Sequence, residues 1–377
     1  FASYCSAPPG SNPTCTQGPA CCETAPATDP AGTPPTVLDD AENGDYDPDH
    51  TQSCELDEID GGAMDRFTSG ASCSDARNFA LAPADVVQGY HDLAAENALA
   101  DRYFQPIAGQ SSSNDMYFAV AHYVFTDNDE KPDTNGSGCD VPGPSTIYTG
   151  QTTIADLLLN AGHSFGFFAE GYKAMMDTAF CPLPPGDCPW GLPTTPCDYD
   201  PADDPFQYYA QFADNLSIQK DLGDFLTGAP TGDFPEVSFI KGVGYHNEHP
   251  GYSTNISQGV DFVSQIVDAV ESSPVADETL VLVTWDEGGG FFDHVRPPPD
   301  STVDQQPYGM RVPLLAIGRF AKRGAISHVQ MEHASIVRFL EWNYLGATGQ
   351  LHARDAVVHD LGSLLDPAET GVTVPSD

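Results

Sequence analysis

Amphipathic stretches and short apolar runs alternate along the chain, and this alternation predicts helices and strands in turn. The clearest amphipathic stretch is 256–270, where apolar residues recur every three or four positions, as on one face of a helix. The apolar run at 279–285 predicts a buried strand. Further helices are predicted at 84–104, 152–161, 206–226 and 331–345, and further strands at 164–168, 237–241 and 312–318.

This order of elements predicts an α/β fold with a doubly wound, mainly parallel sheet and helices on both faces. Residues 1–377 contain no internal repeat and no linker, so we expect a single domain. Residues 1–75 and 181–204 are rich in Pro and Cys and have almost no apolar period, which predicts loop excursions held by disulfides. Since no run of 18 apolar residues occurs, we expect no transmembrane segment.

The charge and cysteine content narrow the class of protein. The chain has 14 Lys and Arg against 55 Asp and Glu, a formal net charge of −41. Such a surface repels nucleic acid, so we expect no nucleic-acid partner. The ten cysteines, an even number without a CxxC pair, favour disulfides over zinc ligation. Disulfides indicate an oxidising compartment and therefore a secreted, periplasmic or cell-surface protein.

One acidic segment follows the predicted strand at 279–285. Asp286 and Glu287 stand at its end, three glycines follow, and Asp293 and His294 come next. Ligands bind at the carboxyl ends of strands in open α/β sheets, so we predict a cation site here; the alternative is a solvated acidic turn. Carboxylate ligands favour Ca²⁺, Mg²⁺ or Mn²⁺, and nearby histidines would also admit Zn²⁺ or Fe.

Six motif regions occur in a fixed order along the chain. They are DPDH at 47–50 with DGGAMDRF at 60–67, LADRYF at 99–104 with SSSN at 111–114, NEHP at 247–250, TWDEGGGFFDHVRPP at 284–298, RVP at 311–313 and EHAS at 332–335. With these motifs the chain resembles the bacterial phosphoesterase family that includes non-haemolytic phospholipases C and a class of acid phosphatases. Asn247 stands where that family has Asp. The resemblance covers about 45–362 and implies an alkaline-phosphatase-like fold.

The resemblance also implies roles for individual residues. It places Ser111 as the nucleophile that forms a phosphoseryl intermediate, and Asp286 and Glu287 as ligands of a divalent metal ion. It implies that Asn114 donates to a phosphate oxygen, and that three histidines bind phosphate oxygens, act as general acid or complete the metal shell: His50, His249 and His294. Alternatives stay open: a nucleophile at Ser112, a polar loop of serines, an Asx turn at Asn114, and structural histidines.

The function implied is an exported, metal-dependent hydrolase of phosphate esters, either a phospholipase C-type diesterase or an acid phosphatase. One departure bears on this prediction. Family members open with a strand whose Glu and Asn bind the metal, and residues 1–5 match only the tail of that motif. We expect a missing or cleaved segment upstream of Phe1 to supply it. The alternative is a catalytically impaired protein with a surface, structural or binding role, and the oligomeric state is left open.

Overall fold

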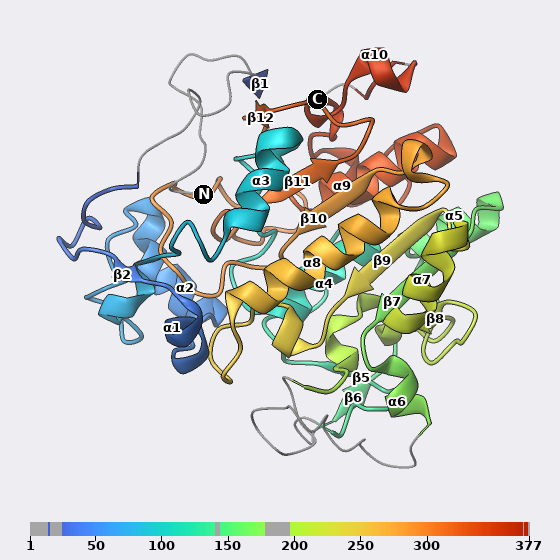
Figure 1. The fold of residues 1–377 in the computed structure, drawn as a ribbon. Coiled ribbons are helices and arrows are strands. Elements are labelled where there is room, and N and C mark those ends of the chain that lie inside the picture. Colours follow the sequence, from blue (N-terminus) through green and yellow to red (C-terminus); the bar gives the residue numbers. More distant parts are fainter. Residues whose placement is uncertain (1–13, 16–24, 140–143, 178–196, 372, 376–377) are drawn as a thin grey trace.

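The computed structural model describes residues 14–15, 25–139, 144–177, 197–371 and 373–375 (Figure 1). A five-stranded sheet and a three-stranded sheet form its centre. The larger has the order β1 (Thr14–Cys15), β12 (Ala325–Ser327), β4 (Ala98–Ala100), β11 (Leu314–Ile317) and β10 (Val281–Thr284). The smaller has the order β8 (Gln219–Asp221), β7 (Phe165–Ala169) and β9 (Val237–Lys241). Two short pairs lie apart from them: β2 (Thr36–Val37) with β3 (Ala80–Leu81), and β5 (Lys131–Pro132) with β6 (Ser145–Thr146).

The two main sheets differ in strand direction. In the smaller sheet β7 pairs in parallel with both neighbours. In the larger sheet β4 is parallel to β12, but β11 runs antiparallel to both β4 and β10. The chain between β10 and β11 contains no helix, and without a crossover the next strand returns in the opposite direction. The predicted α/β class is confirmed, with this antiparallel strand inside it.

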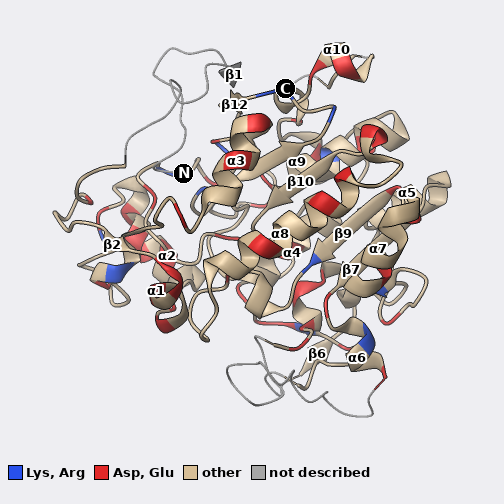
Figure 2. Cartoon of the chain, in the orientation of Figure 1, with Lys and Arg blue, Asp and Glu red and all other residues tan. Residues whose placement is uncertain are grey.

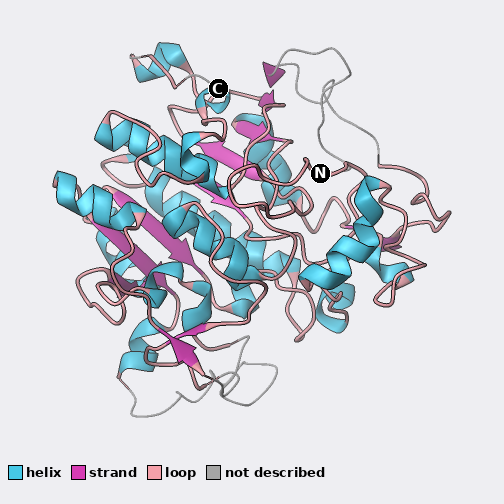
Figure 3. Ribbon diagram, turned by 180° about the vertical axis from the view of Figure 1, so that it is seen from behind, coloured by secondary structure: helices cyan, strands magenta, loops and turns pink. Residues whose placement is uncertain are grey.

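Helices cover both faces of the sheets (Figures 1 and 3). On one face lie α3 (Gln88–Glu96), α7 (Leu222–Gly228) and α8 (Ile256–Glu271). On the other lie α4 (Ser111–Val120), α5 (Ile154–Ala161) and α9 (His333–Leu340). The strands alternate accordingly, as in β4, where Ala98 and Ala100 pack towards α4 and α9 and Leu99 packs towards α3 and α8.

Helix α8 spans both sheets. Its Val267 packs with strands of the larger sheet, whereas Ile266 and Val270 pack with Phe168 of the smaller sheet. Val281 of β10 touches both of these apolar clusters. The carboxyl ends of β9 and β10, which carry site residues, are therefore held in register by one helix.

Several predicted elements have different bounds in the structure. The predicted helix at 84–104 contains α3 and then β4, and the predicted helix at 206–226 contains β8 and then α7, so both predictions were wrong in part. The predicted loops of 1–75 contain α1 (Asp40–Asp45) and α2 (Gln52–Ile59). Two short helices complete the set, α6 (Tyr172–Met176) and α10 (Pro367–Thr370). Most of 181–204 lies outside the described residues.

Disulfides and acidic side chains characterise the outer parts of the molecule. Cys54 and Cys73 form a disulfide that ties α2 to the loop before β3. Cys139 and Cys197 each take part in a disulfide as well. Acidic residues recur on α1, α2, α3 and α8, while Lys and Arg are few and scattered (Figure 2). In the described part of the chain, every helix is too short or too polar to cross a membrane.

Candidate functional site

A cavity of about 500 Å³ lies at the carboxyl ends of β9 and β10. Residues from distant parts of the chain line it: Asn43, Tyr90, Ser111, Lys241, Glu248, His249, Trp285, Asp286, Glu287 and His294. Asp286 and Glu287 follow β10 with one residue, Trp285, between, and Ser111 is the first residue of α4. The sheet ends and one helix N-terminus thus bring the predicted nucleophile and the predicted metal ligands to one cavity.

The side chains of Ser111 and Asp286 lie next to each other at the cavity wall. Burial opposes ionisation of Asp286, but the Lys241 ammonium and the nearby Ser111 hydroxyl outweigh it and lower the pKa of Asp286. The Ser111 position is therefore next to an ionised carboxylate that can accept its proton.

The two serines after Ser111 have other partners. The Ser112 hydroxyl lies beside Tyr208, and the Ser112 backbone N–H donates to the Asn128 side chain at 2.9 Å. The Ser113 hydroxyl donates to the Gln110 carbonyl at 2.7 Å. Of the three serines only Ser111 lines the cavity, so the geometry favours Ser111 over Ser112 as nucleophile.

His333 holds the backbone of Asp286 from inside the core. Its Nε2 lies 2.7 Å from the Asp286 carbonyl oxygen, and its Nδ1 lies 2.8 Å from the Tyr103 hydroxyl. The ring is fully buried and stacks on Phe118 with centroids 4.1 Å apart. Burial lowers the pKa of His333 to about 3, so the ring is neutral and donates from Nε2 to the carbonyl. His333 is a positioning residue for Asp286.

The glycine run connects Glu287 to two other loops. The Gly289 backbone N–H donates to the Glu287 carboxylate, and the Gly288 N–H donates to Gln105 Oε1 at 2.9 Å. Gln105 in turn donates at 3.1 Å to buried Glu55, whose same oxygen accepts from Gly109 N–H at 2.9 Å, just ahead of α4. Burial raises the pKa of both Glu287 and Glu55, so Glu287 requires a cation or a proton nearby.

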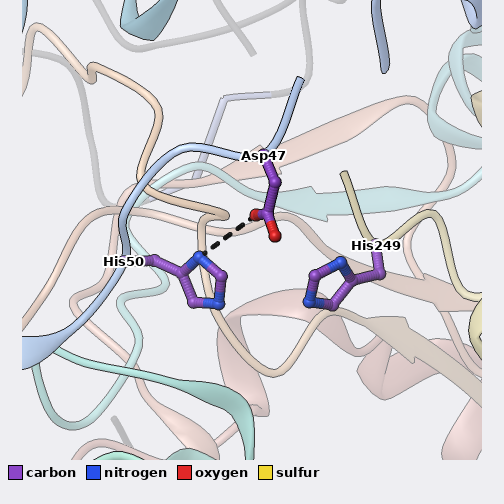
Figure 4. Close-up of side chains that lie close together, drawn as sticks. All are labelled: Asp47, His50 and His249. Atoms are coloured by element: carbon purple, nitrogen blue, oxygen red, sulfur yellow. Dashed lines mark ion pairs between the residues drawn. The ribbon is translucent and has the colours of Figure 1, made fainter. Parts of the chain in front are cut away.

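His50, His249 and Asp47 form a second group, shown in Figure 4. The two imidazole rings approach edge to face with centroids 5.5 Å apart, and His50 Nδ1 lies 3.5 Å from an Asp47 oxygen. Nδ1 of each ring also contacts a backbone carbonyl, Pro48 O at 2.8 Å for His50 and Pro250 O at 2.7 Å for His249. These contacts fix both rings and leave each Nε2 for a ligand oxygen or a metal ion.

The charge on His50 depends on the neighbouring carboxylates. Burial disfavours its protonation, but Glu287 and then Asp47 outweigh burial and raise its pKa.

Gly290 lets the glycine run after Glu287 pack closely against the segment that carries Pro48 and His50. A Cβ at Gly290 would lie 2.9 Å from Pro48 Cβ and 3.3 Å from His50 Cβ. The backbone of Gly290 also has φ +71°, which favours glycine.

His294 lines the cavity, but its neighbour Asp293 is committed elsewhere. Asp293 accepts from Arg311 in a bidentate pair, Nε to Oδ2 at 2.7 Å and Nη2 to Oδ1 at 2.8 Å. His294 Nδ1 lies 3.7 Å from the same carboxylate. Arg311 therefore forms a structural ion pair with Asp293, and His294 lies next to that pair.

Asn114 does not line the cavity. Its Oδ1 accepts from Ile107 N–H at 3.2 Å, and its Nδ2 donates to the carbonyls of Gly109 and Gln110 at 2.8 and 3.1 Å. These bonds occupy the side-chain amide and fix the turn before Ser111. The geometry favours the structural alternative for Asn114 over contact with a phosphate oxygen.

The residues present fit a hard divalent cation. Asp286 and Glu287 supply two adjacent carboxylates at the cavity wall, and burial together with the charge of Asp286 raises the pKa of Glu287, which a cation would counteract. Asp47, His50 and His249 are close enough together to hold an ion as well. Their mixed oxygen and nitrogen donors suit a borderline metal better than Ca²⁺ or Mg²⁺.

Several residues of the site were not predicted from the sequence. Lys241 ends β9 with its ammonium beside Asp115 and Asp286, and Glu248 lies between Tyr90 and Trp285. Asn43 lines the cavity, donates to Thr254 Oγ1 at 3.3 Å and supports the loop that carries His249. A lysine at a strand end, in a chain with few basic residues, was the available signal for Lys241.

Comparison with known proteins gives one family match and several relatives. The family model described as "Phosphoesterase family" matches residues 10–345. A non-hemolytic phospholipase C of Pseudomonas aeruginosa is 32% identical over 172 residues, covering 37% of this chain and 25% of the relative. That of Burkholderia pseudomallei is 26% identical over 68% of this chain and 40% of the relative. Non-specific phospholipase C5 of Arabidopsis thaliana is 25% identical over 67% of this chain and 46% of the relative.

The chain thus spans between a quarter and just under half of the length of these relatives. Among solved structures, a protein in the alkaline phosphatase superfamily from Vibrio parahaemolyticus matches with a TM-score of 0.38 and 14% identity, covering 67% of this chain and 59% of that one. At this level the structural likeness carries no functional argument.

Proposed function

Because the chain belongs to the Phosphoesterase family, we propose that it is an exported, metal-dependent hydrolase of phosphate esters with Ser111 as nucleophile. The observation that carries the proposal is that Ser111 lies beside Asp286 at one cavity, which Glu287 and His249 also line. A nucleophile, an acceptor for its proton and candidate proton donors are therefore within one site.

In the proposed first step, the Ser111 oxygen forms a bond to phosphorus and the ester oxygen leaves. Asp286 accepts the hydroxyl proton, and the leaving oxygen takes a proton from an imidazolium of the His50–His249 pair, in which His249 lines the cavity and neighbouring carboxylates raise the pKa of His50. Water then attacks the phosphoserine and gives a proton to the now neutral imidazole, while the Ser111 oxygen leaves and takes its proton back from Asp286. A divalent ion held by Asp286 and Glu287 would neutralise charge on the phosphoryl oxygens and favour the alkoxide.

Two further observations bear on the substrate class and on the location of the protein. The relatives are named phospholipases C, which favours a diester substrate, while an acid-phosphatase-type monoester fits the same chemistry. The Cys54–Cys73 disulfide supports an oxidising compartment and thus export.

A paired assay tests the proposal. Hydrolysis of nitrophenyl phosphate and nitrophenyl phosphocholine is followed with and without a chelator, on wild type, Ser111→Ala and the matched control Ser112→Ala. We expect chelator-sensitive hydrolysis of at least one ester, lost by a factor of about 10³ or more in Ser111→Ala and largely kept in Ser112→Ala.

The two parts of the proposal fail separately in this assay. A wild type that hydrolyses neither ester contradicts the enzyme proposal and favours the impaired, ligand-binding alternative. Equal activity in Ser111→Ala contradicts only the choice of nucleophile.

A further inference from the structure

Lys241 is surrounded by carboxylates from three distant parts of the chain. Its Nζ lies 3.3 Å from an Asp115 oxygen, 3.8 Å from an Asp203 oxygen and 3.8 Å from an Asp286 oxygen. The side chain is 20% exposed, and both Lys241 and Asp286 line the cavity. The cluster is thus part of the wall of the candidate site.

The hydrogen-bonding capacity of this ammonium exceeds what the cluster uses. An ammonium has three N–H donors. In the described structure the one hydrogen bond recorded for it is to Asp115, at 3.3 Å, while Asp203 and Asp286 lie beyond hydrogen-bond distance. Donors are therefore left for an oxygen atom that enters the cavity.

The cluster places this charge close to the nucleophile. Asp115 follows Ser111 by one helical turn on α4, so their side chains share a face of the helix. Asp286 lies beside Ser111 and attracts Lys241, and all three residues line the cavity. A phosphorus atom within bonding distance of Ser111 would bring its non-bridging oxygens near the ammonium.

The other strong cation at the cavity wall is committed to a partner. Arg311 and Lys241 are the Lys and Arg side chains that line the cavity in the described structure, and Arg311 forms the bidentate pair with Asp293. In a chain with 55 acidic residues, carboxylates at the cavity repel a phosphate ester, and the Lys241 ammonium offsets part of that repulsion.

We propose that Lys241 is a phosphoryl-binding residue, whose ammonium donates to a non-bridging oxygen of the substrate beside Ser111. The proposal rests on the proposed function for the reaction, but anion binding by Lys241 can be measured without turnover. The competing explanation is that Lys241 only neutralises Asp115, Asp203 and Asp286, which would affect folding and not anion affinity.

The experiment compares wild type with Lys241→Met, Lys241→Arg and the control Lys220→Met. Lys220 is on β8, at the other edge of the same sheet, and does not line the cavity. Binding of inorganic phosphate is measured by calorimetry at fixed metal concentration, and unfolding by urea. We expect the phosphate dissociation constant to rise about tenfold in Lys241→Met, because a charge-assisted hydrogen bond is lost. Lys241→Arg should recover part of the loss, and Lys220→Met should match wild type.

If Lys241→Met does not fold, the double variant Lys241→Met/Asp115→Asn takes its place in the comparison, because it removes both partners of the ion pair. Phosphate affinity within twofold of wild type in the substituted protein overturns the inference, as does a wild type that binds no phosphate. Failure of the proposed function appears in the ester assay instead, where wild type would show no chelator-sensitive hydrolysis. For an active wild type, kcat/KM should fall by about 10²–10³ in Lys241→Met.

Discussion

His333 Nε2 donates a 2.7 Å hydrogen bond to the backbone carbonyl of Asp286, so a core histidine fixes the backbone of the residue that contacts Ser111. Tyr103 holds the other ring nitrogen, and Phe118 covers the ring face. The position of the carboxylate therefore depends on packing in the core as well as on the loop that carries it.

Replacing His333 tests this dependence. His333→Phe keeps a flat ring against Phe118 but leaves the Asp286 carbonyl unpaired, so we expect divalent-metal affinity to fall about 10–100-fold, as for other groups that support metal ligands. Calorimetric metal titration measures the change. Tyr103→Phe removes only the outer hydrogen bond and should cost about 1 kcal/mol of stability with a smaller loss of affinity. Unchanged metal affinity in His333→Phe would contradict the positioning role.

Gly289 and Gly290 form a matched pair that separates backbone strain from contact. Both have positive φ, +66° and +71°, so alanine at either should cost about 1–2 kcal/mol of folding free energy. A Cβ at Gly290 also lies 2.9 Å from Pro48 Cβ, whereas at Gly289 the nearest neighbour is 3.4 Å away. We expect Gly290→Ala to be the less stable variant in urea unfolding and to lose more activity, because His50 would be displaced. Equal effects would contradict this contact.

Arg354 forms a buried ion-pair network with Asp304 and with Glu332, the residue before His333. Arg354 donates to Asp304 at 2.7 Å and to Glu332 at 2.7 Å, and its side chain is fully buried. Arg354→Met leaves two buried carboxylates without their cation, so we expect a loss of about 3–5 kcal/mol in unfolding free energy. Arg319→Met breaks an exposed pair with Glu369 and should leave the unfolding free energy nearly unchanged. Similar values for the two variants would contradict the difference in burial.

Glu248 makes stability depend on pH. Burial raises its pKa to about 7, although Tyr90 and Trp285 donate hydrogen bonds to the carboxylate. Its stabilising contribution is present below the unfolded value near 4.5 and is lost as pH rises through about 7. Urea unfolding at pH 4.5, 6 and 7.5 should show this loss in wild type, and the difference from Glu248→Gln should change over the same window. A pH-independent difference between the two proteins would contradict it.

The sequence identified the chemistry of the site better than its geometry. Asp286 and Glu287 were predicted because an apolar strand runs directly into unusual polar residues and glycines. Helix α4 was not predicted, because its first residues have low helix propensity and all ten of its residues are buried, so it shows no amphipathic period. Strand β4, three residues long, could not be separated from the preceding helical pattern.

Lys241 shows what a linear pattern cannot supply. Its partners are at 115, 203 and 286, and only the folded chain brings them together. Asn114 shows the converse, because its place in a motif implied contact with phosphate while its amide is used to hold the turn before Ser111. The sequence also does not predict which cysteines pair, and the Cys54–Cys73 disulfide is evident only from their proximity in the fold.

The span of α8 over both sheets has a consequence for the site. Lys241 ends a strand of the smaller sheet, and Asp286 follows a strand of the larger one, so their 3.8 Å separation measures how the two sheets are docked. Val267→Ala would leave a cavity in the α8 interface and loosen the contact between the two sheets, far from any reacting group. Turnover would then decline at temperatures where the molecule still holds its secondary structure, and inactivation would precede melting.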